Sequence, residues 1–86
     1  MTVTNYLYTH ATATQDMGWQ YAGGPISTMP PWVKAVVESV SNGIAHVHTS
    51  EHGTEACLPG SWIVRTNAGL VLVKSNAAFR EAYTVA

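Results

Sequence analysis

The chain has 86 residues, enough for one domain with a small core, and we treat residues 1–86 as a single domain. Only 10% of the residues are charged and the net charge is −1, which excludes a sequence-independent grip on DNA or RNA through clustered Lys and Arg. One cysteine excludes an internal disulfide, and the start MTVTNYLY lacks the basic and apolar regions of a secretory signal, so we expect a cytoplasmic protein.

The chain is 47% hydrophobic and only 10% charged. Its surface therefore has to be built mostly from uncharged polar side chains and alanine. Such a surface favours burial against another subunit or a partner, and we expect a homo-oligomer. No apolar run reaches membrane-spanning length.

Residues 2–9, TVTNYLYT, are rich in strand formers and predict a β-strand. Residues 10–29 have no period of either kind and are interrupted by glycines and a proline, which predicts a long loop. Trp19 and Tyr21 in this loop either cover an open edge of the core or form a recognition surface.

Residues 30–40 favour a helix that begins at Pro30 and Pro31, since proline is well tolerated in a first helical turn. The large apolar residues recur at helical spacing, and SNG follows as a stop: Trp32, Val33, Val36, Val37 and Val40. The many valines favour a strand instead, but strict alternation fails because Lys34 and Glu38 would share the face of Trp32.

The second half of the chain predicts two hairpins and a closing helix. Residues 44–50 and 54–58 form the first hairpin, and 59–60 (Pro-Gly) suit a type II turn before the second. In the second hairpin a four-residue loop, 66–69, would set Trp62 opposite Val73 and leave both faces apolar. Ser75 can cap a helix that presents Phe79 and Tyr83 on one side.

These elements predict an α+β fold: a small curved antiparallel β-sheet of about four to five strands, open or barrel-like, with one early helix and one C-terminal helix. The second apolar face of the hairpin requires a cover, which is the closing helix, the long loop or another subunit.

The C-terminal half carries a recurrent arrangement: PGSWIV at 59–64, then Gly69, then Phe79 and Tyr83. It resembles the signature of a widespread group of small bacteriophage and prophage accessory proteins, which have a Gly-Asp-Tyr/Trp-Ile-Ile strand, a Gly-Glu hairpin loop and a closing Phe-x-x-x-Tyr helix. Ser61 and Leu70 replace the acidic residues of that pattern. The resemblance implies a phage accessory protein in the cytoplasm of the infected bacterial host, and it implies no catalytic residue.

The candidate metal ligands are His46, His48 and Cys57, because two histidines at strand spacing point the same way and the cysteine could return across the hairpin. No CxxC or HExxH pattern accompanies them, and an inward face of Ala45 and Val47 would leave the histidines facing solvent. A Cys57/His nucleophilic pair lacks an orienting third group. We therefore predict no cofactor, no metal and no enzymatic activity.

Two classes of binding function remain. In the first, the protein is an anti-CRISPR-like inhibitor that binds a host defence protein through aromatic anchors. In the second, it sequesters a nucleotide-derived immune signal, with aromatics for the base and cations for phosphate. The candidate binding residues for either are Trp19, Tyr21, Trp32, Arg65 and Lys74. A structural or replication accessory role is a third alternative.

Overall fold

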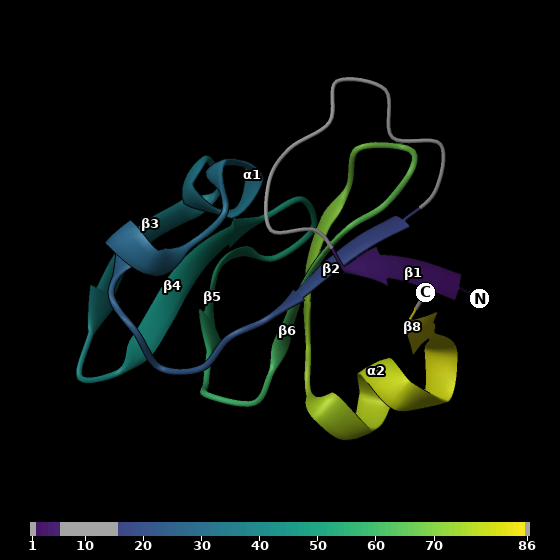
Figure 1. The fold of residues 1–86 in the computed structure, drawn as a ribbon. Helices are drawn as coiled ribbons and strands as arrows, with labels where there is room; N and C mark the ends of the chain where they lie inside the picture. Colours follow the sequence, from purple (N-terminus) through teal and green to yellow (C-terminus); the bar gives the residue numbers. More distant parts are fainter. Residues whose placement is uncertain (1, 6–15, 86) are drawn as a thin grey trace.

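The computed structural model describes residues 2–5 and 16–85 (Figure 1). Within them lie two α-helices, one short 3-10 helix and eight strands. The helices are α1 (Pro31–Lys34), α2 (Asn76–Ala82) and the 3-10 helix η1 (Ile26–Thr28). The strands are β1 (Thr2–Asn5), β2 (Asp16–Gln20), β3 (Val37–Ser41), β4 (Ile44–Thr49), β5 (Gly53–Cys57), β6 (Trp62–Arg65), β7 (Val71–Lys74) and β8 (Thr84–Val85).

The strands form two open sheets, and the two α-helices are separate from them in sequence, which confirms the predicted α+β class. One sheet has the order β7-β6-β2-β1-β8 and the other has the order β3-β4-β5. The expected antiparallel pairing holds for β2-β6-β7 and for β3-β4-β5, while β1 adds parallel pairings with β2 and β8. Figure 1 shows the three-stranded sheet on one side of the molecule and α2 beneath the other.

The predicted long loop at 10–29 is wrong for Asp16–Gln20, which is strand β2 in the middle of the larger sheet. After β2 the chain is irregular up to α1 apart from η1, and residues 10–15 lie outside the described residues. Strand β2 pairs with β1 on one side and with β6 on the other, where Trp19 faces Ile63. Two neighbouring strands impose the strand on a sequence, DMGWQ, whose own strand preference is weak. Of the strand predicted at 2–9, the first part is β1, and residues 6–9 lie outside the described residues.

The helix predicted over 30–40 is also wrong beyond Lys34. The one-turn helix α1 begins at Pro31 as expected, and the chain then enters β3 at Val37. Val36 already accepts a hydrogen bond from the His48 N–H at 2.8 Å, so pairing with β4 starts where the helix ends. A register shift between Val37 and Ser39 accounts for the failed alternation. Glu38 is the extra residue of this bulge, so Val37 and Val40, three residues apart, pair with the inward-facing Val47 and Ala45.

The hairpin predicted at 44–58 is confirmed as β4 and β5, with Thr49 opposite Gly53 at its tip. Ala45 and Val47 are fully buried, as expected for the inward face. The Pro-Gly turn that follows is confirmed too: the Ser61 N–H donates to the Leu58 carbonyl at 2.9 Å, and Gly60 has φ +92°.

The β6–β7 hairpin is confirmed, but its register differs by one residue from the predicted one. Trp62 lies opposite Lys74 rather than Val73. The Thr66 N–H donates to the Leu70 carbonyl at 2.8 Å, so this pair closes a shorter loop. Gly69 has φ +89°, the left-handed conformation that ends many three-residue hairpin loops.

Both faces of this hairpin are apolar, and both are covered within the described chain. On one face Trp62, Val64 and Phe79 form a small core with α2. The Trp62 and Phe79 rings stack with centroids 3.8 Å apart. The Ser75 hydroxyl oxygen accepts from the Ala78 N–H at 3.2 Å, which confirms the predicted cap of α2. The hairpin therefore needs no second subunit to cover it, and the homo-oligomer stays a prediction.

The other face belongs to the main core, which lies between the two sheets and α1. Its buried members are Met17, Tyr21, Met29, Trp32, Val33, Val37, Ala45, Val47, Cys57, Ile63 and Val71. Strand β7 lies beside β4 and β5, so it joins the two sheets along one edge. None of the helices in the described residues is long and apolar enough to span a membrane.

Candidate functional site

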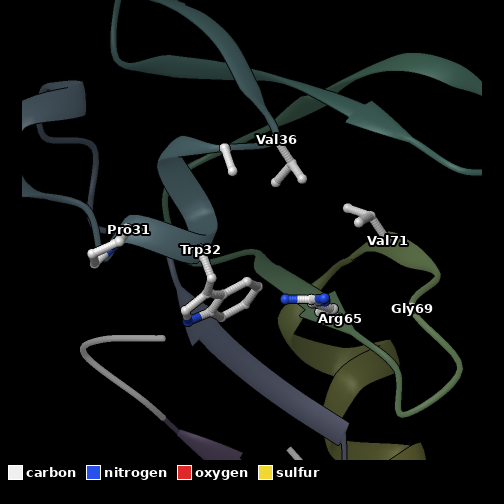
Figure 2. Close-up of a pocket in the computed structure, with 7 residues that line it drawn as sticks. Pro31, Trp32, Val36, Arg65, Gly69 and Val71 are labelled. Carbon is white, nitrogen blue, oxygen red and sulfur yellow. The ribbon is translucent and has the colours of Figure 1, made fainter. Parts of the chain in front are cut away.

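A cavity of about 390 Å³ lies where α1 faces the loop end of the β6–β7 hairpin (Figure 2). Its lining consists of Pro31, Trp32, Ala35, Val36, Arg65, Gly69 and Val71. Five of these are apolar, one is glycine and one is a cation. This size and this lining are typical of sites that bind small organic molecules, in which apolar walls surround a few polar groups.

The wall on one side is built by the single turn of α1. The Val33 and Lys34 N–H groups both donate to the Pro30 carbonyl at 3.0 Å, which starts the turn directly after the two prolines. The turn ends when the chain pairs with β4 at Val36. Trp32 and Val36 are four residues apart around this turn, so they lie at neighbouring positions of one wall, as Figure 2 shows.

The opposite wall is the last pair of the β6–β7 ladder, where Arg65 lies opposite Val71. Two hydrogen bonds from outside the hairpin fix this end. The Val71 N–H donates to Ser50 Oγ at 2.8 Å, and the Ser50 N–H donates to the Val71 carbonyl at 3.1 Å. On the loop, the Asn67 N–H donates to Asp16 Oδ1 at 2.9 Å. The wall is therefore anchored to both sheets.

Arg65 gives the cavity its charge. Its side chain is exposed, and Figure 2 shows its guanidinium directed toward the Trp32 ring. No acidic residue lines the cavity. The ion pairs in the described part of the chain join His48 to Glu38 and His52 to Glu51, so neither neutralises Arg65. A guanidinium with no carboxylate beside it can offer paired N–H donors to a carboxylate, phosphate or sulfonate.

Trp32 is 3% exposed, and its indole N–H has no hydrogen-bond partner among the described residues. In Figure 2 this nitrogen lies on the side of the ring away from Arg65. The ring thus contributes apolar surface to the cavity and no donor beside the guanidinium.

The structure brings together two of the five predicted binding residues, Trp32 and Arg65. Tyr21 is 1% exposed and its hydroxyl donates to the Gly24 carbonyl at 2.7 Å, so it is a core residue. Burial raises its pKa, with a smaller contribution from the Cys57 charge. Trp19 is half-buried against the main core, with its ring centroid 5.9 Å from that of Tyr21. For these two aromatics the core-covering alternative is the one that the packing supports.

Lys74, the remaining candidate, lies elsewhere. It lines a second cavity of about 360 Å³ between β7 and the tip of the β4–β5 hairpin, together with Thr49, Glu51, His52, Glu55, Leu70, Leu72 and Val73. Two glutamates line this cavity beside the single lysine, so it offers no net positive charge that would select an anion.

The candidate metal ligands do not converge. Cys57 is fully buried and lies opposite Ala45, on the inward face of the β4–β5 hairpin. His46 and His48 alternate with the buried Ala45 and Val47 and therefore lie on the outward face. The described residues contain no group of three potential metal ligands. Burial also raises the pKa of the Cys57 thiol to about 11, which opposes the thiolate that a metal or a nucleophile requires.

The sequence does not indicate the other five lining residues as parts of the site: Pro31, Ala35, Val36, Gly69 and Val71. It predicts a helix at Val36 and a four-residue loop that places Leu70 rather than Val71 opposite Arg65. A glycine that ends a three-residue hairpin loop was the available signal, because that loop alone gives the observed register.

No family model, curated protein or solved structure matches the chain.

Proposed function

We propose that this protein is a non-catalytic binding protein that takes a small organic anion into the cavity between α1 and the β6–β7 hairpin. The observation that carries the proposal is Arg65, a guanidinium that forms no ion pair with a carboxylate of the described residues, at the rim of a cavity whose other side chains are apolar. The guanidinium would bind the anionic group, and Trp32 and the valines would cover the apolar body.

The resemblance of the C-terminal half to phage accessory proteins favours a counter-defence role for this binding. In that role the protein sequesters a small signal of the host immune response, a nucleotide derivative among the candidates, in the cytoplasm of the infected cell. Sequestration needs stoichiometric binding and no chemical step, in keeping with a site that contains one cation and no nucleophile or general base among its lining residues.

Direct inhibition of a host defence protein has less support from the arrangement of side chains. Of the aromatic residues expected to anchor such an interface, Tyr21 and Trp32 are buried and Trp19 is half-buried. The exposed large hydrophobic residues of the described chain are Leu58 and Leu70, and strand β6 separates the turn that holds one from the loop that holds the other. Binding hot spots cluster in one patch, which these two residues do not form.

Isothermal titration calorimetry with naphthalenesulfonate and its neutral isostere naphthalenesulfonamide tests the proposal. Because a hydrogen bond to a charged group contributes about 1.5–3 kcal/mol, the anion should bind roughly tenfold to a hundredfold more tightly than the neutral compound. Arg65→Gln should remove this preference, whereas Arg80→Gln, at an exposed position of α2, should keep it. Equal binding of both compounds by the unmodified protein would contradict the proposal.

A further inference from the structure

The single positive charge of the cavity restricts the charge of the ligand that it can bind. This inference rests on the function proposed above. Arg65 is the one charged residue of the lining, and the residues around it contribute hydrocarbon or backbone. A ligand group with one negative charge is balanced by this guanidinium. A group with two negative charges leaves one of them unpaired against apolar walls, where a lone charge is costly.

The hydrogen bonds of the loop reinforce this restriction. The N–H groups of Asn67, Gly69, Leu70 and Val71 donate to Asp16, Thr66 and Ser50 within the protein. These backbone donors of the hairpin end are therefore not available to a second anionic oxygen.

We propose that the site selects monoanions: ligands with a single phosphodiester, carboxylate or sulfonate group attached to an apolar or planar body. Phosphomonoesters in their doubly charged form and oligophosphates are rejected. Among nucleotide-derived signals, this favours a cyclic mononucleotide, with its one phosphodiester charge, over linear nucleotides and multiply charged cyclic oligonucleotides.

The proposal can be tested with two probes that share one body. Naphthalenesulfonate keeps a single charge at all the pH values used, whereas naphthyl phosphate loses its second proton with a pKa of about 6. If the monoanion alone binds, naphthyl phosphate is about 90% competent near pH 5 and about 1% competent near pH 8. Its affinity relative to naphthalenesulfonate should therefore rise nearly a hundredfold between about pH 8 and about pH 5.

The sulfonate also reports on titration of the protein itself. The lining contains no His, Asp, Glu, Cys or Tyr. The elements around the cavity contribute Lys34 of α1 and the pair of His48 and Glu38, where the His48 N–H bonds the Val36 carbonyl. They also contribute Asp16, whose neighbour Met17 pairs with Arg65, and Tyr83, which is bonded to Asp16. Any effect of these groups changes the binding of both probes and cancels in the ratio of their affinities.

A second cation in the lining should relax the selection. Ala35 is an exposed residue of the cavity wall with helical φ −64°, so Ala35→Lys can be accommodated without rebuilding the backbone. Ala35→Lys should raise the affinity for naphthyl phosphate near pH 8 about tenfold relative to naphthalenesulfonate, one added charged hydrogen bond being worth about that factor. Ala82→Lys, at an exposed position of α2, is the matched control and should change nothing.

The outcomes separate the two proposals. A ratio that stays constant with pH overturns the selection of monoanions and leaves the binding function standing. Binding of neither probe, with the same result for Arg65→Gln, overturns the binding function and the selection with it.

Discussion

The hydroxyl of Tyr83, at the end of α2, donates to Oδ2 of Asp16, at the start of β2, with an oxygen–oxygen distance of 3.0 Å. The other carboxylate oxygen of Asp16 accepts from the Asn67 N–H at 2.9 Å. One carboxylate, 9% exposed, thus joins the central strand to the closing helix and to the loop at the rim of the cavity. Loss of either hydrogen bond should therefore lower the free energy of unfolding of the whole domain.

Tyr83→Phe should lower the free energy of unfolding by about 1–2 kcal/mol, because it leaves an oxygen of a mostly buried carboxylate without its partner. Urea denaturation at neutral pH measures this change. The substitution removes the hydroxyl and keeps the ring and the backbone, so a variant as stable as the unmodified protein would show that the bond to Asp16 contributes nothing.

The same residue should make stability depend on alkaline pH. Burial, the hydrogen bond to Asp16 and the charge of Asp16 together raise the pKa of Tyr83 from 10.0 to about 12. Since the folded state holds this proton more tightly than the unfolded state, the stabilisation is complete below pH 10 and is lost as the pH rises toward 12. The decline measured by denaturation over this range should be shallower in Tyr83→Phe, and an unchanged slope would contradict this assignment.

The small core beneath α2 depends on Phe79. Its ring stacks on Trp62 and lies 5.1 Å, centroid to centroid, from the ring of Tyr83, and it is fully buried. Phe79→Leu should lower the free energy of unfolding by about 1–1.5 kcal/mol and Phe79→Ala by about 3–5 kcal/mol, a large part of the stability of a small domain. Thermal melting compares them with Arg80→Ala, an exposed neighbour that should melt like the unmodified protein. A melting temperature unaffected by Phe79→Leu would mean that α2 does not cover this face.

Ser50 should act on the site through Val71. Ser50→Ala removes the oxygen that accepts from the Val71 N–H and leaves one hydrogen bond between β7 and the β4–β5 tip. We expect a loss of about 0.5–1.5 kcal/mol in stability and a severalfold weaker binding of naphthalenesulfonate, because Val71 and Arg65 form one wall. Ser50→Thr keeps the acceptor oxygen and should restore both. Weakened stability with unaltered binding would show that the wall does not need this anchor.

Cys57 should be unreactive in the folded protein. It is fully buried, and burial raises the pKa of its thiol from 9.0 to about 11. At neutral pH, modification by an aromatic disulfide reagent should therefore proceed only as fast as the domain opens, and denaturant should accelerate it greatly. Equal rates in native buffer and in denaturant would place the thiol at the surface.

The parts of the fold that could be predicted are those in which local chemistry and final structure agree. The turn at Gly60 needs positive φ, the cap at Ser75 needs a side-chain acceptor, and the tip between β4 and β5 has a glycine at residue 53, where φ is +66°. Each of these is decided by residues close in sequence.

The parts that could not be predicted depend on distant partners. Strand β2 exists because β1 and β6 lie on its two sides, and α1 stops at Lys34 because the backbone of Val36 pairs with that of His48. The composition of the site also depends on distant residues. The sequence indicates Trp32, Arg65 and Lys74 as binding residues, but only the fold shows that the first two share a cavity and that Lys74 lines another.

Native mass spectrometry of the protein purified from defence-competent or infected host cells tests the central claim most directly. The proposed function requires one bound small molecule of several hundred daltons for each chain, roughly the size that a cavity of this class accepts. It also predicts that Arg65→Gln loses this molecule and that Arg80→Gln retains it. A chain without a bound molecule, or a co-purifying host polypeptide that Arg65→Gln retains, would contradict the proposed function, and the polypeptide would favour direct inhibition.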